Sequence, residues 1–159
     1  MLRKIVHFPN PVLRAKTEEV TVFDDELKNL VSDMYETMED ADGCGLAAPQ
    51  IGLSKRLAVI EYNGEKLTII NPEISNRVGS SVREEGCLSF PGVFEKVEAP
   101  DKITLTYQTE TGEKITEDIE GFLARIVCHE TDHLFGRMII DRVPPLKRTL
   151  IKKRLARKD

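Results

Sequence analysis

Five consecutive residues, His129-Glu130-Thr131-Asp132-His133, constrain the fold more than any other segment of the chain. In a helix, side chains four residues apart share a face at a Cβ separation of about 5–6 Å, so His129 and His133 can bind one metal ion. Glu130 lies about 100° around the helix from His129, within reach of a bound water without having to be a ligand. Two of the three histidines in the chain are in this segment. The pattern predicts the metal-binding helix of a hydrolase.

The alternative is a surface helix whose histidines are ordinary polar side chains. The preceding turns argue against it because they carry large apolar residues, namely Phe122, Leu123, Ile126 and Val127. A helix with these residues is expected to be buried, and buried histidine and glutamate side chains need partners. We therefore expect a buried helix from about Glu120, ended by Gly136.

The rest of the chain predicts one further helix on each side of a region of strands. A helix is expected over residues 24–40, where apolar residues recur at helical spacing and Asp24 or Asp25 can cap the start. A basic helix is expected over about residues 146–158, with a narrow apolar side formed by Leu146, Leu150, Ile151 and Leu155. Between them, β-branched and alternating segments predict antiparallel strands at 56–61, 66–71, 93–98, 103–108 and 113–119.

These elements favour an α+β fold in which antiparallel sheets pack around the metal-binding helix. The length of 159 residues and the absence of repeats or linkers predict a single domain over residues 1–159. No apolar run approaches the ~20 residues of a membrane helix, and no secretory signal is visible. Three cysteines offer no disulfide framework, so we expect a cytoplasmic protein with free thiols.

Two histidines leave the metal site incomplete, so the third ligand distinguishes between types of hydrolase. A metzincin would need a histidine at position 139, where this chain has Ile139, and the only acids after His133 are Asp141 and Asp159. The third ligand is therefore expected upstream. Cys87, in a segment with the small residues Gly86 and Ser89, is the best candidate, although a lone cysteine is more commonly a small buried hydrophobe.

Three segments together resemble the peptide deformylase family, whose motifs are G-x-G-L-A-A-x-Q, E-G-C-L-S and H-E-x-D-H. The chain matches every fixed position of these motifs at residues 43–50, 85–89 and 129–133. The opening segment 9–14 fits as well, so the resemblance covers about residues 3–155.

The resemblance implies Cys87, His129 and His133 as metal ligands, with a fourth position left for water or substrate. It implies Fe(II) as the native ion, with zinc, nickel or cobalt also accepted. The implied reaction removes the N-formyl group from the initiator methionine of new polypeptides and releases formate. Glu130 would act as general acid–base, while the Gln50 side chain and the Leu88 backbone N–H would stabilise charge on the formyl oxygen.

The same resemblance implies a substrate that lies extended along the chain, with its backbone against Gly45, Glu85 and Gly86. Phe122 and Ile126 are candidates for the methionine pocket, as is Phe94, although core packing explains these three equally well. Cys128 stands where many relatives have glutamine, and packing is the expected role for it and for Cys44. Asp132 is expected to orient a ligand or to pair with an arginine.

The C-terminal end is basic although the chain as a whole has a net charge of −4. Residues 147–159 hold seven lysines and arginines and one aspartate, which leaves the other residues strongly acidic. A basic helix can contact phosphate backbone, and the family resemblance makes the ribosome a candidate partner; a solvated helix face is the equal alternative. Neither DNA nor a membrane is expected as a partner.

Other functions remain open from the sequence. A general metallopeptidase would share the H-E-x-x-H chemistry, but it leaves the two upstream motifs unexplained. A non-catalytic metal-binding or sensor protein would not need Glu130 and Gln50, and both are present. An RNA-binding module that depends on the basic tail leaves the ligand set unexplained.

Overall fold

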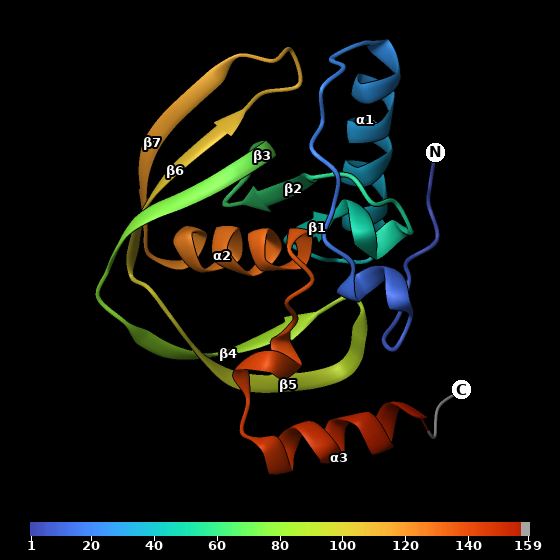
Figure 1. Ribbon diagram of the computed structural model, residues 1–159, viewed down its shortest axis with the longest axis vertical. Helices are drawn as coiled ribbons and strands as arrows, with labels where there is room; N and C mark the ends of the chain where they lie inside the picture. Colours follow the sequence, from blue (N-terminus) through green and yellow to red (C-terminus); the bar gives the residue numbers. More distant parts are fainter. Residues whose placement is uncertain (157–159) are drawn as a thin grey trace.

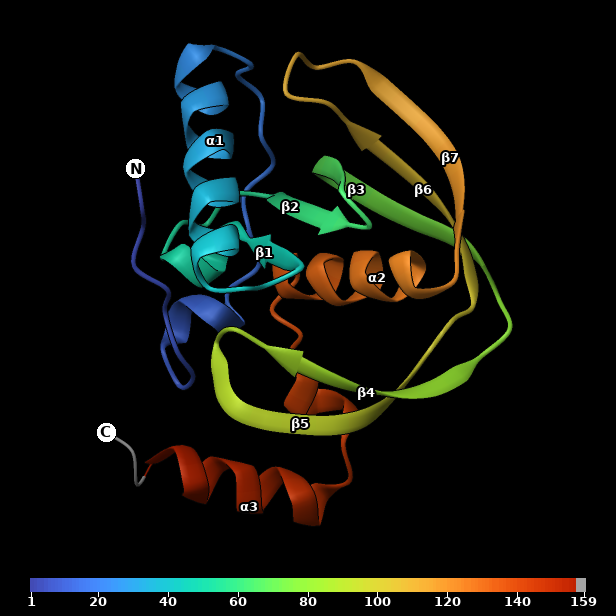
Figure 2. The ribbon, with the colours of Figure 1, turned by 180° about the vertical axis from the view of Figure 1, so that it is seen from behind.

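In the computed structural model, which describes residues 1–156, helix α2 (Phe122–Leu134) lies between two antiparallel sheets (Figure 1). The larger sheet has the strand order β1-β2-β3-β6-β7, and the smaller sheet is the hairpin β4-β5. The view from behind shows the two sheets on opposite sides of α2 (Figure 2). The strands are β1 (Gly45–Ala47), β2 (Leu57–Tyr62), β3 (Glu65–Val78), β4 (Ser81–Cys87), β5 (Phe90–Ala99), β6 (Lys102–Gln108) and β7 (Lys114–Glu120). The predicted α+β fold around a central helix is confirmed.

Strand β2 explains how one sheet packs against two helices. Its side chains alternate between the faces, as the pleat of a strand requires. Ala58 and Ile60 pack in a cluster with α2, whereas Leu57 and Val59 pack in a second cluster with α1. All four residues are fully buried. The larger sheet therefore holds α2 on one face and is itself covered by a helix on the other.

Helix α1 (Asp25–Asp40) forms as the sequence predicts. The side chain of Asp24 accepts a hydrogen bond of 3.0 Å from the backbone N–H of Leu27 and so caps the first turn. The apolar stripe faces the larger sheet, and Tyr35 at its margin hydrogen-bonds Thr68 of β3 at 2.9 Å. The buried residues of the helix are Leu27, Leu30, Val31, Met34, Thr37 and Met38.

Helix α3 (Pro145–Ala156) lies along the outer side of β5 (Figures 1 and 2). Ile151 and Leu155 are buried in a third cluster with residues of β5, but Leu146 is 73% exposed and Leu150 is 57% exposed. Of the predicted apolar side, only Ile151 and Leu155 are therefore packed, whereas the first half of the helix contacts β5 through a polar contact between Lys147 and Glu95. Positions 157 and 158 of the predicted helix lie outside the described residues.

Among the described residues, no helix combines the length and the apolar character needed to cross a membrane.

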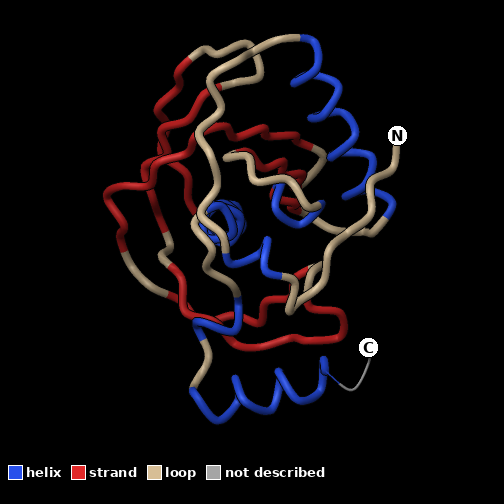
Figure 3. The backbone as a smooth tube through the Cα atoms, turned by 45° about the vertical axis from the view of Figure 1, so that its right-hand side comes forward, coloured by secondary structure: helices blue, strands red, loops and turns tan. Residues whose placement is uncertain are grey.

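The remaining helical segments are short 3-10 turns. They are η1 (Pro11–Arg14), η2 (Ala48–Ile51) and η3 (Ile139–Arg142). Figure 3, which looks nearly along α2, shows strands on several sides of this helix.

Strand β3 continues beyond the predicted end at position 71, past Pro72. Asn71 has a positive φ of 51°, and the pairing of β3 with β6 shifts register between Ile70 and Glu73. This irregularity lets the strand pass a proline, which cannot donate to the ladder. The Asn71 side chain holds the bend by donating to the carbonyl of Val20 and accepting from its N–H.

Strands β1 and β4 were not predicted. Strand β1 has only three residues and begins at Gly45, so it is too short for a periodic signal. Strand β4 is mostly exposed or half-buried, and its sequence therefore lacks apolar alternation. These two strands nevertheless carry much of the site described next.

Candidate metal centre

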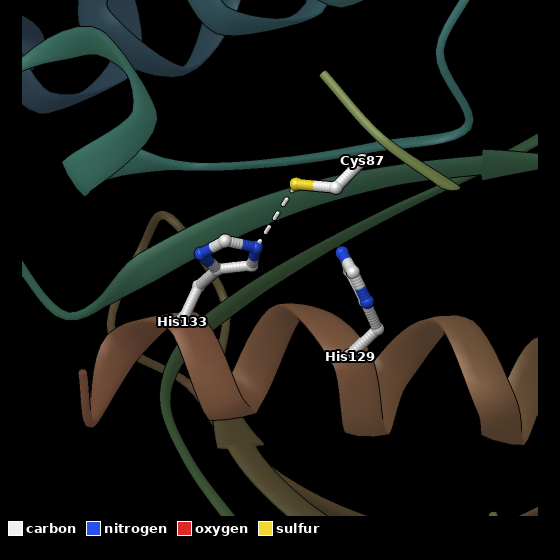
Figure 4. A group of neighbouring side chains, drawn as sticks. All are labelled: Cys87, His129 and His133. Carbon is white, nitrogen blue, oxygen red and sulfur yellow. Dashed lines mark hydrogen bonds between the residues drawn. The ribbon is translucent and has the colours of Figure 1, made fainter. Parts of the chain in front are cut away.

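Three potential metal ligands from two elements meet beside α2. Cys87 is the last residue of β4, and His129 and His133 lie one turn apart on α2. One ligand atom from each lies within 4.8 Å of the other two, and Cys87 Sγ is 3.2 Å from His133 Nε2. The three side chains point toward one another (Figure 4). The structure thus brings together the residues that the sequence separates.

The donors fit a divalent ion. One thiolate with two imidazoles is a ligand set used for such ions, and three protein ligands leave a position for water or substrate. His133 is fully buried, and no described residue hydrogen-bonds its Nδ1. Burial, with the nearby charge of His129, lowers the pKa of His133 well below its usual range. A neutral imidazole with a free lone pair is the form that binds a metal.

His129 lies between two carboxylates. Its Nδ1 is 3.3 Å from Glu85 Oε1, and its Nε2 is 3.5 Å from Glu130 Oε1. Burial alone would lower the pKa of His129, but hydrogen bonds to Cys87 and Glu85 and the charge of Glu130 raise it well above the usual value. Negative charge therefore converges on this ring, where a divalent cation would offset it.

Glu130 is 2% exposed, and burial raises its pKa to about 7. Its Oε2 has no hydrogen-bond partner among the described residues. Space for this side chain depends on Gly45, because a Cβ at that position would lie 2.9 Å from both Cγ and Cδ of Glu130. The carboxyl group therefore stands beside the three ligands and is free to bind another group.

Gln50, at the end of the first motif, reaches the same point from η2. Its Oε1 accepts a hydrogen bond of 2.9 Å from the backbone N–H of Ala47, which fixes the orientation of the amide. Its Nε2 then donates toward Cys87 Sγ at 3.4 Å and Ser89 Oγ at 3.2 Å. The amide donor is thus held beside a metal ligand.

A cleft of about 640 Å³ opens onto these groups. The predicted substrate-contacting residues Gly45, Glu85 and Gly86 line it, as do Leu88 and the pocket candidates Phe122, Ile126 and Phe94. Ile126 is buried, whereas Phe94 is 64% exposed above Gly86. The structure gathers all of these residues at one site, and their contacts with substrate stay predictions.

Sequence reasoning missed Arg125, which also lines the cleft and is 4% exposed. A charged residue one turn before His129 in an otherwise apolar stretch was the available signal. His7 and the segment Phe90–Val93 also line the cleft. They lie outside the three sequence motifs, Phe90–Val93 directly after the second motif and His7 near the start of the chain, so the motifs did not mark them.

The remaining candidates have simpler explanations. Cys128 packs in the cluster with α2, and burial raises the pKa of its thiol to about 11, so a packing role fits it. Cys44, in contrast, is exposed at the cleft, so the packing role expected for it is wrong. Asp132 forms an ion pair with Arg142, one of the two roles expected for it.

The sequence model of the family described as polypeptide deformylase matches residues 2–149. The chain belongs to this family. A peptide deformylase from Acidobacterium capsulatum is 48% identical over 98% of this chain and 94% of its own length. The crystal structure of a peptide deformylase from Legionella pneumophila superposes with a TM-score of 0.94 at 41% identity, covering 99% of this chain and 95% of that chain. The peptide deformylase structure from Thermotoga maritima gives a TM-score of 0.89 at 44% identity, covering 91% of this chain and 99% of that chain.

Proposed function

We propose that this deformylase-family protein hydrolyses the N-formyl group of the initiator methionine in new polypeptides and releases formate. The observation that carries the proposal is the meeting of Cys87, His129 and His133 beside a buried carboxyl group and an oriented amide. A divalent ion at these ligands supplies a Lewis acid that lowers the pKa of bound water toward ~7 and polarises a carbonyl oxygen.

Glu130 acts as the general acid–base. Its carboxylate accepts a proton from the attacking water and then delivers that proton to the departing amine. Burial raises its pKa to about 7, so both the protonated and ionised forms are accessible near neutral pH. Glu130 is buried and Gly45 lies directly against its side chain. Its carboxyl group therefore has little freedom to move away from the reacting atoms.

Gln50 stabilises the charge that develops on the formyl oxygen. Its Nε2 is held by the Ala47 contact before substrate arrives, so little reorganisation is needed during the reaction. The backbone N–H of Leu88, next to Cys87, is the second donor in this proposal. Loss of one such donor typically lowers the rate by ~10²–10³.

The polypeptide is proposed to lie between β1 and β4. In the described sheets β1 pairs only with β2, and β4 pairs only with β5, so each strand has one edge without a strand partner. Gly43–Gly45 and Glu84–Cys87 both line the cleft. An extended peptide can hydrogen-bond to such edges independently of its sequence, which suits substrates that differ after the first residue. Phe122 and Ile126 would then contact the methionine side chain.

Fe(II) is the proposed native ion, with zinc, nickel or cobalt able to use the same ligands. A thiolate and two imidazoles accept several divalent ions, so metal content after anaerobic purification decides between them. A reducing cytoplasmic environment would keep Cys87 available as a ligand.

The ribosome is the proposed partner of α3. Lys152 and Lys153 are exposed on this helix, where they can approach phosphate groups. Replacing both with glutamate should weaken co-sedimentation with ribosomes, more so at low salt, while sparing formate release from a short peptide. The matched control is Lys114→Glu on β7, which is also exposed. Unchanged co-sedimentation of the double variant would remove this partner.

Formate release from a formyl-methionyl tripeptide tests the main proposal. The protein is purified anaerobically or loaded with Ni(II) or Co(II), and the peptide is also analysed for internal cleavage. Glu130→Ala should lower kcat by ~10²–10⁴, whereas the exposed control Glu120→Gln should not. No formate from the metal-loaded wild type, or cleavage of internal bonds instead, would overturn the proposal.

A further inference from the structure

Arg125 is a buried cation that neither metal binding nor the acid–base steps require. It lies on α2 one turn before His129 and is 4% exposed. A guanidinium removed from water is costly unless its donors are satisfied. Its contacts therefore indicate what it holds in place.

All the hydrogen bonds of its guanidinium go to the β4-β5 hairpin. Nη1 donates to Glu85 Oε2 and, at 2.8 Å, to the carbonyl oxygen of Val97. Nη2 donates to the carbonyl oxygen of Ser81 at 2.7 Å and to Ser81 Oγ at 3.3 Å. The planar fork of arginine donors spans both strands, which the single ammonium of lysine cannot do.

This contact matters because the ligands come from separate elements. Cys87 is on β4, whereas His129 and His133 are on α2, and the hairpin forms a sheet of its own. No strand ladder therefore fixes the distance between Cys87 and the histidines. Arg125 joins the two elements close to the ligands, since it lies four residues before His129 and its partner Glu85 lies two residues before Cys87.

Glu85 extends the connection to His129. One carboxylate oxygen pairs with Arg125, and the other is 3.3 Å from His129 Nδ1. A carboxylate at the second nitrogen of a metal-binding histidine fixes the orientation of the ring, and loss of such a partner commonly costs 10–100-fold in metal affinity.

We propose that Arg125 is a positioning residue that fixes Cys87 and the Glu85–His129 pair relative to helix α2 and so sets the geometry of the metal site. The inference rests on the proposed metal-dependent function. It differs from a purely structural role, in which Arg125 would support folding without affecting the metal.

Metal affinity and the Co(II) absorption spectrum test this role. Arg125→Met should weaken Co(II) and Ni(II) binding by ~10–100-fold in competition with a chelator, and it should change the cobalt bands that report coordination geometry. The metal affinity of Arg125→Lys should lie between those of Arg125→Met and the wild type, because lysine restores a positive charge near Glu85 but not the planar fork of donors. Adding Glu85→Gln to Arg125→Met should weaken metal binding by less than the product of the two single effects.

The control is Arg56→Met. Arg56 is also partly buried and donates to the carbonyl oxygen of Thr17 at 2.8 Å, but it does not line the cleft. The Arg56→Met substitution should lower Tm without changing metal affinity or the cobalt spectrum. If Arg125→Met fails to fold, Arg125→Lys carries the same measurements.

Wild-type metal affinity and an unchanged cobalt spectrum in the Arg125 variants would overturn the inference, even if Tm falls. Failure of the proposed function would look different, since the wild type would then bind metal but release no formate.

Discussion

Adding one methyl group at Gly45 should displace the general acid–base. A Cβ there would lie 2.9 Å from Cγ and Cδ of Glu130 and 3.2 Å from its Oε1. Carbon atoms in contact stay about 3.5–4.0 Å apart, so the carboxyl group must move by about 0.6 Å or more. Glu130 is 2% exposed and has little space to move into. Since a misplacement of about 1 Å can cost ~10²-fold in rate, we expect Gly45→Ala to lower kcat by ~10–100-fold.

The assay is formate release under steady-state conditions with metal content measured in each preparation. Overpacking should also lower the free energy of unfolding by about 1–3 kcal/mol, so a control of similar stability is needed. Gly64→Ala serves, because Gly64 has φ +78° and no described atom lies within 4 Å of its Cβ position. Its strain should cost about 1–2 kcal/mol with kcat unchanged. If Gly45→Ala raises KM alone at full metal content, Gly45 contacts substrate without positioning Glu130, and the reasoning is refuted.

Three further predictions concern stability. Leu105→Ala removes a fully buried side chain from the cluster around α2 and should lower the free energy of unfolding by about 2–5 kcal/mol, measured by urea denaturation; a loss below 1 kcal/mol would contradict the packing described. Burial raises the pKa of Asp141, but hydrogen bonds from Arg14 and the Met138 N–H outweigh it and lower that pKa, so its stabilisation is present at neutral pH and lost as pH falls below about 4. The Tm difference between wild type and Asp141→Asn should therefore shrink between pH 6 and pH 3. A constant difference would contradict the stabilising role of the Asp141 carboxylate. Removing the metal with a chelator should lower Tm, since an ion present at 100 times its Kd contributes about 2.7 kcal/mol, and restoring Ni(II) should recover Tm.

The central helix was predictable because its sequence carries two independent signals. The large apolar residues before His129 indicate burial, and the spacing of His129, Glu130 and His133 indicates a shared site. Helix α1 was equally clear, since an unbroken apolar stripe follows an aspartate that can cap it. Both elements depend on local sequence, which is what periodicity can detect.

Strand β4 was less predictable because its side chains serve the site instead of a core. Glu85 is directed at Arg125 and His129, and Gly86 leaves room for Phe94, so neither produces apolar alternation. The role of Gly45 was also out of reach, because its close contact with Glu130 joins residues far apart along the chain. Such contacts depend on how the two sheets approach α2.

The division of the ligands between hairpin and helix also bears on when the protein can acquire its metal. Cys87 and His133 are 46 residues apart along the chain, and they meet only when the hairpin has closed onto α2. An unfolded chain offers an ion the histidine pair or the thiol, but not the three donors as a set. The complete ligand set therefore forms only after His133 has left the ribosome and the hairpin has docked. Tight binding of the ion then reports that this docking is complete.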